Sequence, residues 1–185
     1  MRPLVAVALL LPQVPMLFMG EEWGASSPFP YFCDLHGDLG VAVQKGRCEQ
    51  ISKLPGVSQE DLKNAPNCQA ESTFLSAKLN WGELAQPEHV AWMELYGGLL
   101  RVRLQRIVPL LRGLSGQCGT FEVLGPGALR VRWTLAEGRE LYLAANLWHK
   151  PTGGFGEAAG ELIWAEGPAG TGDELGAWSV RWAVA

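Results

Sequence analysis

The first 19 residues hold two apolar runs, which a short turn separates. The first run, residues 4–11, predicts the buried end of a helix, and Pro12, Gln13 and Pro15 form the turn. The second run, residues 15–19, is apolar on both faces of a strand, as is typical of parallel sheets covered by helices. The order of helix, turn and strand therefore predicts an α/β arrangement.

A secretory signal is the alternative interpretation of this segment, because Arg2 precedes an apolar run. No cleavage site of small residues follows promptly, and the prolines divide the run into halves that are too short for the ~20 apolar residues of a membrane span. We therefore favour the buried helix and strand, and we expect a cytoplasmic protein with no membrane partner.

The pattern changes after Trp23, since residues 24–80 are rich in Gly, Pro, Ser, Asn and Asp. Only scattered apolar residues interrupt this composition, which predicts a long loop region with short turns of helix. One such turn is expected around residues 58–64, where Ser58 and Asp61 have the spacing of a capping box.

A helix is predicted from Pro87, which suits a first helical position, to the region of Pro109 and Gly113. Residues at spacings of three and four indicate its buried face, and the pair Gly97–Gly98 indicates close packing against another element. The positions on the predicted buried face are Val90, Met93, Gly97, Leu100, Leu104 and Ile107.

From about Gly119 the apolar residues alternate with a period of two, which predicts half-buried strands. Segments 121–123, 129–133 and 141–143 show this alternation, and segments 162–164 and 178–182 add two further strands. We predict a small antiparallel β-sandwich over residues 115–185, joined to an α/β part over residues 1–114.

Composition narrows the possible functions. A net charge of −4 and a pI near 5.4 give no general attraction to nucleic acid or to anionic lipid. The four cysteines form no C-x-x-C pair, so a zinc site is not expected, and nothing else argues for a disulfide framework. The chain contains no recognisable nucleotide-binding or nucleophile motif, and we expect no cofactor.

Eight tryptophans are many for this length. Trp-rich β modules often bind sugars, but a buried tryptophan core is the favoured explanation. Exposed indoles would favour sugar binding, whereas buried indoles would indicate a structural domain. The tryptophans in question are Trp133, Trp148, Trp164, Trp178 and Trp182.

Glu21 and Glu22 are the most suggestive polar residues, because they end the second apolar run beside Trp23. Neighbours on a continuing strand point to opposite faces, so the two carboxylates cannot form the close pair that glycoside hydrolysis needs. One of them can still line a site at the carboxyl end of the strand. The alternative, slightly favoured for each residue alone, is that both cap loops or bind arginines.

Other polar groups suggest less chemistry. Residues 34–38 (DLHGD) offer too few metal ligands and predict a solvated turn, and His89 and His149 have no nucleophile in a recognisable setting. The arginines of the predicted helix, which are Arg101, Arg103, Arg106 and Arg112, indicate a paired helix face.

Residues 9–32 (LLLPQVPMLFMGEEWGASSPFPYF) also resemble the last barrel strand and the following loop of α-amylase-type glycoside hydrolases of family 13. Within that group the segments MLFMGEEWGA and PFPYFCD are most similar to the malto-oligosyltrehalose trehalohydrolases. Gly46–Arg47, Thr73–Phe74, residues 76–81 and the helix 96–103 add to the likeness, whereas CEQISK at 48–53 departs from it.

The resemblance implies an α/β and all-β protein, in which residues 1–114 are the C-terminal part of a TIM-barrel catalytic domain and residues 115–185 its β domain. It implies hydrolysis of the α-1,4 bond beside the terminal trehalosyl unit of malto-oligosyltrehalose, which releases trehalose. The family's catalytic acids lie on strands expected upstream of Met1, so the chain alone should be inactive. It further implies that Glu21, Glu22 and Trp23 bind substrate and that a missing barrel portion is supplied in cis or in trans. A non-catalytic sugar-binding or structural β module is the alternative.

Overall fold

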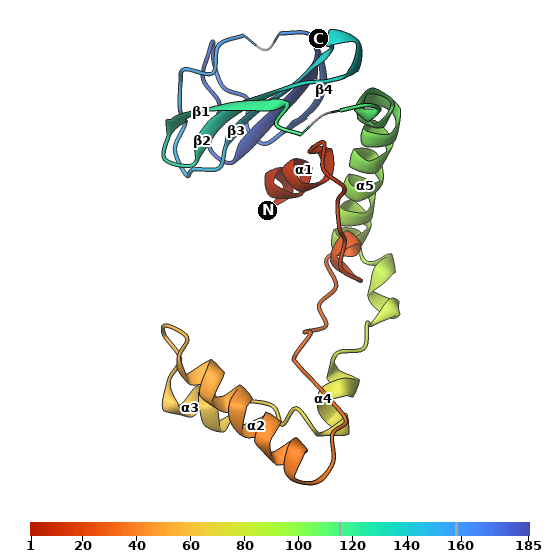
Figure 1. Cartoon of the computed structure of the whole chain (residues 1–185), viewed down its shortest axis with the longest axis vertical. Coiled ribbons are helices and arrows are strands. Elements are labelled where there is room, and N and C mark those ends of the chain that lie inside the picture. The colour runs from red at the N-terminus through yellow and green to blue at the C-terminus, as the bar shows by residue number, and fades with distance from the viewer. Residues whose placement is uncertain (115, 158) are drawn as a thin grey trace. The chain divides into compact units, whose positions relative to one another are not determined.

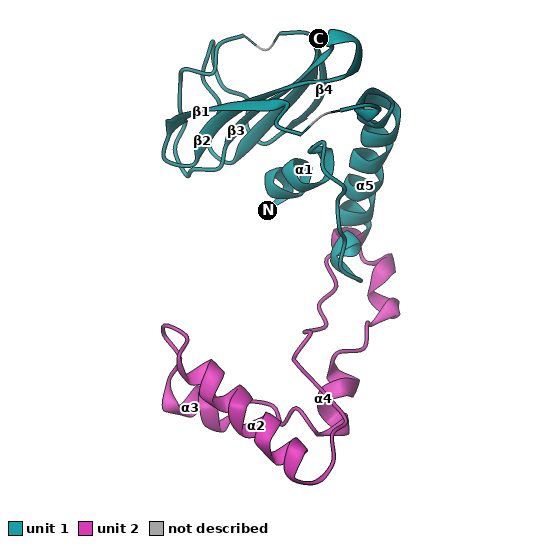
Figure 2. Cartoon of the chain, viewed as in Figure 1, with its two compact units in different colours: residues 1–23, 90–185 teal, residues 24–89 magenta. Residues whose placement is uncertain are grey.

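The computed structural model describes residues 1–114, 116–157 and 159–185 (Figure 1). The chain forms two compact units (Figure 2). Unit 1 consists of residues 1–23 and 90–185, and unit 2 of residues 24–89. The predicted boundary between residues 114 and 115 adjoins Ser115, which lies outside the described residues, and it stays a prediction.

Unit 1 is built on one antiparallel sheet whose strands follow the order β1-β2-β3-β5-β4. The five predicted strand segments are confirmed, but the predicted sandwich is wrong, because the described strands form a single five-stranded sheet. Helices supply the second layer (Figure 1). The strands are β1 (Gly119–Gly125), β2 (Ala128–Thr134), β3 (Glu140–Asn146), β4 (Glu161–Glu166) and β5 (Ser179–Val184).

The core of unit 1 lies between the sheet and two helices. Helix α1 (Arg2–Leu10), which confirms the predicted helix, contacts β4 and β5 and buries Leu9 and Leu10 in the same cluster as Leu141 and Trp182. The indoles of Trp133 and Trp182 stack in this core with ring centroids 5.8 Å apart. Apolar burial by the helices therefore replaces the facing sheet of a sandwich.

Helix α5 (Pro87–Val102) continues through a π-helical turn at Arg103–Ile107 and a 3-10 turn at Val108–Leu111. Ile107 is buried as predicted and Leu100 is half-buried against the core, but the predicted face is wrong at Val90, Met93 and Leu104, which are exposed. The buried stripe instead holds Leu95, Tyr96 and Leu99. Both stripes carry apolar residues at helical spacing, so the period alone could not choose between them.

The segment 15–19, predicted to be a buried strand, is not a strand here and pairs with no described strand. Val14 and Met16 are 92% and 95% exposed, and Leu17 is 40% exposed. A parallel strand needs neighbours on both sides for its backbone groups, and the described part of this chain offers it none.

Unit 2 is more helical than predicted. The loop prediction for residues 24–80 is wrong at α2 (Gly37–Ser52), whereas α3 (Gln59–Lys63) confirms the predicted turn and its capping box between Ser58 and Asp61. Helix α2 buries only Gly40 among its residues, so its sequence shows no apolar stripe to detect. Two shorter elements complete the unit, α4 (Glu71–Ser76) and the 3-10 turn Trp81–Ala85.

Within the described residues, no helix has both the length and the apolar character needed to span a membrane.

Candidate functional site

The predicted site residues Glu21, Glu22 and Trp23 form a single 3-10 turn at the end of the segment 15–19. Gly20, with a φ of 89°, turns the chain into it. Glu21 accepts a hydrogen bond from the backbone N–H of Phe18 at 3.1 Å, and Glu22 accepts one from Gly20 at 2.9 Å. Both carboxylates thus satisfy backbone donors that precede the turn.

Glu21 is also joined to α5. The Tyr96 hydroxyl donates to Oε1 of Glu21 at 3.2 Å, and Tyr96 is only 6% exposed. Burial raises the pKa of Tyr96 to about 12, and the negative charge of Glu21 contributes to the increase. A neutral phenol therefore fixes one oxygen of Glu21 at any ordinary pH.

These contacts match the alternative in which both glutamates cap a loop. The expected opposite orientation of the two carboxylates assumed a continuing strand, and the observed 3-10 turn removes that premise. Trp23 is only 2% exposed, so its indole offers no face to a ligand in this conformation. Glu21 is exposed and Glu22 is half-buried, so both remain accessible.

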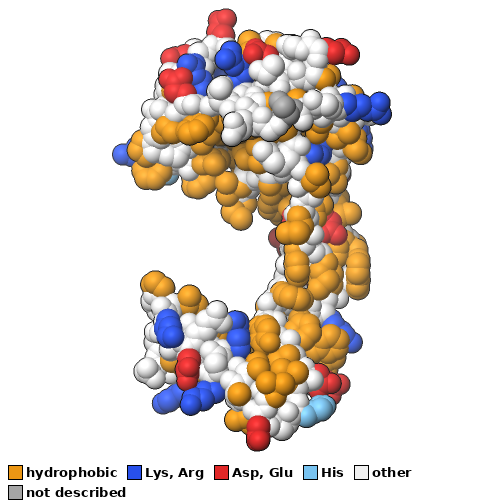
Figure 3. Space-filling view, viewed as in Figure 1, with side chains coloured by type: hydrophobic (Ala, Val, Ile, Leu, Met, Phe, Trp, Pro, Cys, Tyr) orange, Lys and Arg blue, Asp and Glu red, His pale blue; other side chains and the backbone are white. Residues whose placement is uncertain are grey.

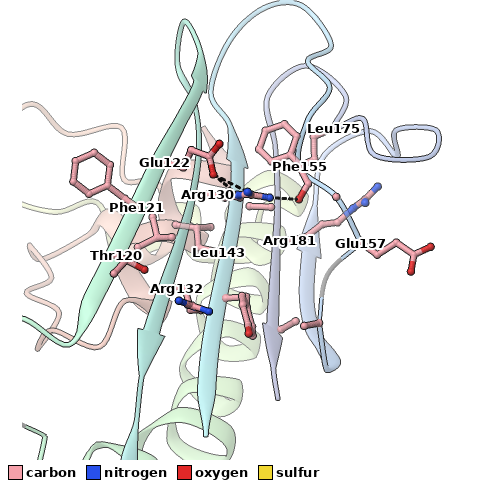
Figure 4. Close-up of a pocket in the computed structure, with 16 residues that line it drawn as sticks. Thr120, Phe121, Glu122, Arg130, Arg132, Leu143, Phe155, Glu157, Leu175 and Arg181 are labelled. Atoms are coloured by element: carbon pink, nitrogen blue, oxygen red, sulfur yellow. Dashed lines mark hydrogen bonds and ion pairs between the residues drawn. The ribbon is translucent and has the colours of Figure 1, made fainter. Parts of the chain in front are cut away.

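A groove on the other face of the sheet had no clear signal in the sequence (Figure 4). Ala144 and Ala183 alternate with the core residues Leu143 and Trp182, so they face away from the helices and form a floor of small side chains. This floor leaves a cavity of about 410 Å³, within the size range of small-molecule sites.

The walls of the groove carry charge of both signs. Arg130 pairs with Glu122 at 2.6 Å and also donates to the carbonyl of Phe155 (Figure 4). Arg132 approaches Glu140 at 3.6 Å. Among the described residues no carboxylate lies within ion-pair distance of Arg181. The pairing of the arginines across strands follows from the register, which the sequence pattern did not specify.

The basic residues of α5 behave only partly as predicted. Arg106 pairs with Glu161 of β4, as expected for a paired helix face. Arg103 is instead buried and donates to the carbonyls of Leu9 and Gln13, at 3.0 and 2.8 Å. Its role is structural, because one acceptor lies in the last turn of α1 and the other just beyond it, where carbonyls lack helical partners.

The tryptophans divide into two groups. Trp133 and Trp182 are buried and Trp164 is half-buried, as a structural core requires. Trp148 and Trp178 are 38% and 45% exposed, and the backbone N–H of Trp178 donates to the backbone carbonyl of Trp148 at 3.0 Å.

The other polar residues singled out from the sequence do not come together as a catalytic group. The side chains of Asp34 and His36 are 93% and 88% exposed, as predicted for a solvated segment, but the predicted turn is wrong at Gly37 and Asp38, which begin α2. His89 is buried near Glu88, and the ring of His149 lies 4.3 Å from that of Trp148. No group of three metal-ligating side chains occurs in the described parts of the chain.

Many large apolar side chains reach the surface of the protein (Figure 3). Those on unit 1 include Met16, Met93, Leu104, Phe121 and Val123, which are between 44% and 95% exposed. An exposed apolar surface of this kind marks an interaction site more often than a solvated face.

Comparisons with known proteins support the resemblance. A domain family described as a domain of unknown function, DUF3459, matches residues 117–182. The malto-oligosyltrehalose trehalohydrolase of Deinococcus radiodurans is 50% identical over 98 residues, which are 53% of this chain and 16% of the relative. The enzyme of the same name from Mycobacterium tuberculosis is 32% identical over 179 residues, covering 95% of this chain and 29% of the relative.

The structural comparison agrees. A Salmonella typhimurium protein assigned as an α-amylase superposes with a TM-score of 0.87 at 35% identity, over 100% of this chain and 30% of its own. The trehalulose synthase of Pseudomonas mesoacidophila MX-45 shares the fold alone, with a TM-score of 0.53 at 16% identity over 98% of this chain and 37% of its own. The chain thus spans less than a third of the length of the curated relatives it matches.

Proposed function

This chain matches the C-terminal part of the malto-oligosyltrehalose trehalohydrolases, and from that premise we propose that it serves in an α-amylase-type glycoside hydrolase that releases trehalose from malto-oligosyltrehalose. The observation that carries the proposal is the likeness over 95% of the chain to a relative more than three times as long. The exposed segment 15–19 supports it, because a barrel strand would need further strands on both sides.

In this proposal residues 1–114 complete a TIM barrel whose remaining portion is supplied in cis or in trans. The catalytic acids belong to that portion, and the chain alone is inactive. Glu21 and Glu22 lie where the last strand would end, with accessible carboxylates that can accept hydrogen bonds from sugar hydroxyls. Trp23 holds their turn in place.

A chimera tests the function. This chain replaces the matching segment of the Mycobacterium tuberculosis relative, which covers 95% of the chain, and trehalose release from maltotriosyltrehalose is measured for the chimera and for the chain alone. We expect release by the chimera and none by the chain. Release by the chain alone contradicts the placement of the catalytic acids in the remaining portion. A folded chimera that cleaves linear malto-oligosaccharides but not maltotriosyltrehalose contradicts the proposed activity.

The role of the turn is tested in the same chimera with Glu21→Ala and Glu22→Ala. A carboxylate that binds sugar should raise KM or lower kcat by about tenfold, the equivalent of one hydrogen bond to a charged group. Glu60→Ala provides a matched control, because Glu60 is an exposed carboxylate on α3 and is far along the chain from the turn. Unchanged kcat and KM in both glutamate variants would remove them from the site.

A second candidate function is sugar binding by the β domain, which the exposure of Trp148 and Trp178 favours. The buried side-chain amide of Asn146 fixes the adjoining backbone. It donates to the backbone carbonyls of Lys150 and Leu175 and accepts from the backbone N–H of Trp148. Exposed indoles on a rigid turn can stack on pyranose rings. Maltoheptaose should then quench the tryptophan fluorescence of the chain. The Trp148→Ala and Trp178→Ala variants should lose this quenching, while Trp81→Ala in unit 2 should keep it.

A further inference from the structure

Two of the four cysteines lie side by side in unit 2, although they are far apart in the sequence. The Sγ atoms of Cys33 and Cys68 are 3.9 Å apart, and both thiols are free. The backbone joins the same two residues, because the N–H of Cys33 donates to the carbonyl of Cys68 at 2.9 Å. A contact that involves both backbone and side chains holds the sulfurs near bonding range.

Glutamine side chains fix the positions of the two sulfurs. The amide of Gln69 donates to Sγ of Cys33 at 3.2 Å and reaches Sγ of Cys68 at 3.8 Å, while its oxygen accepts from the N–H of Leu35. Gln44 of α2 accepts from the N–H of Cys68 at 2.8 Å. The cysteines are thus held by α2 and by both chain segments that meet here.

The two thiols differ in accessibility. Cys33 is half-buried, whereas Cys68 is only 3% exposed. Burial raises the pKa of the Cys68 thiol, and its hydrogen bond with Cys33 adds to the increase. An oxidant in solution therefore reaches Cys33 first, and Cys68 is placed to resolve the product.

We propose that Cys33 and Cys68 form a disulfide bond when a low-molecular-weight disulfide is present, and that this bond stabilises the helical unit 2. The thiolate of Cys33 attacks one sulfur of the oxidant, which forms a mixed disulfide and releases one small thiolate. Cys68 then loses its proton to the solvent and attacks Sγ of Cys33, which expels the second small thiol. Two protein thiols are oxidised and one small disulfide is reduced.

The bond would close the segment between residues 33 and 68, which contains α2 and α3. Unit 2 has few buried apolar residues: Cys68 and Ala77 are the buried hydrophobic residues among its described positions. A cross-link restricts the unfolded chain by an amount that grows with the length of the closed loop. A unit with so small a core depends on such additional stabilisation more than a large domain does.

Peptide mapping tests the pairing. The full chain is incubated with oxidised glutathione in native buffer, its remaining thiols are alkylated, and it is digested with trypsin without reduction. Peptides 1–45 and 64–78 carry Cys33 and Cys68, while 48–53 and 113–130 carry Cys48 and Cys118 as internal controls. We expect the first two peptides to be joined at least about tenfold more often than any other pair, because their thiols have a high effective concentration.

The same reaction in concentrated guanidinium chloride should lose this selectivity. Equal pairing of the four cysteines in native buffer, or a persistent mixed disulfide at Cys33, would overturn the proposal.

Limited proteolysis tests the consequence. Trypsin sites at Lys45, Arg47 and Lys53 lie in or beside α2, between the two cysteines. Oxidation should slow cleavage at these sites about tenfold, and it should do so equally in Cys48→Ser. In Cys33→Ser oxidation should have no effect. Cleavage that proceeds at one rate in the oxidised and the reduced chain would show that the bond does not stabilise the unit.

Discussion

Arg103 is a buried cation that backbone carbonyls, rather than a carboxylate, stabilise. It is 6% exposed and donates to the carbonyls of Leu9, Leu11 and Gln13. Burial lowers its pKa, but a guanidinium remains charged. We expect Arg103→Met to lower the free energy of unfolding by about 3 kcal/mol, because several buried acceptors lose their donor.

Urea unfolding of the chain measures this loss. The free energy of unfolding of Arg103→Lys should lie between that of the parent chain and that of Arg103→Met, since one ammonium cannot reach all the carbonyl acceptors. Arg101→Met is the matched control on the exposed side of α5 and should stay within about 0.5 kcal/mol of the parent chain. A similarly small effect of Arg103→Met would mean that water replaces the guanidinium.

Tyr96 should make the stability of unit 1 depend on alkaline pH. Its folded-state pKa of about 12 exceeds the ordinary value of 10.0, so the folded state holds the phenolic proton more tightly than the unfolded state does. The resulting stabilisation is fully present below pH 10 and is lost as the pH rises through 12. The pKa difference corresponds to roughly 2–3 kcal/mol.

Absorbance titration of the phenol and urea unfolding at pH 9 and at about pH 11 check the size and the sign of this effect. Glu21→Gln removes the negative charge beside the hydroxyl and should lower the pKa of Tyr96, whereas Tyr96→Phe should remove its share of the pH dependence. Stability that increases between these pH values would contradict the argument.

At the scale of elements, alanine substitutions at the adjacent glycines of α5 distinguish the effect of helix propensity on stability from the effect of packing. A methyl group on Gly98 would approach the Trp164 ring at 3.2 Å, while one on Gly97 meets nothing within 4 Å. Gly97→Ala should therefore raise the free energy of unfolding by about 0.5–1 kcal/mol. Gly98→Ala should gain less or lose stability, because the indole must move.

Thermal unfolding of both variants decides between these effects. Trp164→Leu should restore part of the gain in the Gly98→Ala background by making room for the methyl group. Equal gains from both alanines would show that the indole yields without cost. The sequence alone indicated close packing at both glycines, and only Gly98 has it.

The elements also show what the pattern could predict. Alternation over residues 129–133 and 141–143 located β2 and β3 correctly, because these strands bury one face on the helices. Residues 121–123 also lie in a strand, β1, but the expected half-burial is wrong there, since Phe121 and Val123 are 75% and 68% exposed. Helix α2 was missed, since it buries almost nothing, and the buried face of α5 was assigned correctly only at Leu100 and Ile107, since two of its faces are apolar. The period of apolar residues reflects which side chains the folded protein buries. It therefore does not reveal an element such as α2, which buries almost none of its side chains.

The candidate site was harder to predict than the fold. The segment around Glu21 and Glu22 was singled out as a candidate site at the end of a strand, and this role stays a prediction. The 3-10 turn replaces the expected strand end, and the contact between Glu21 and Tyr96 joins residues 75 positions apart. The sulfur contact of Cys33 and Cys68 and the alanine floor of the sheet groove likewise depend on tertiary structure. No spacing rule encodes such contacts.

At the scale of the whole molecule, the exposed apolar residues carry the strongest link to function. Val14 and Met16 are 92% and 95% exposed in this chain, although a strand of their composition is suited to a buried sheet. If they meet a barrel portion, their environment differs completely between the chain alone and the longer enzyme. One substitution can therefore give opposite results in the two contexts.

Met16→Glu provides this test. In the chain alone we expect the free energy of unfolding to stay within about 0.5 kcal/mol of the parent, and self-association measured by sedimentation to fall, because the charge replaces an exposed apolar group. In the chimera with the Mycobacterium tuberculosis relative, the same charge would be buried without a partner and should destabilise the enzyme by about 3 kcal/mol or more. Gln13→Glu, in the preceding turn, serves as the control and should be tolerated in both contexts. A Met16→Glu chimera as stable as its parent would mean that this segment stays in water in the longer enzyme, and the barrel assignment of residues 15–19 would then be untenable.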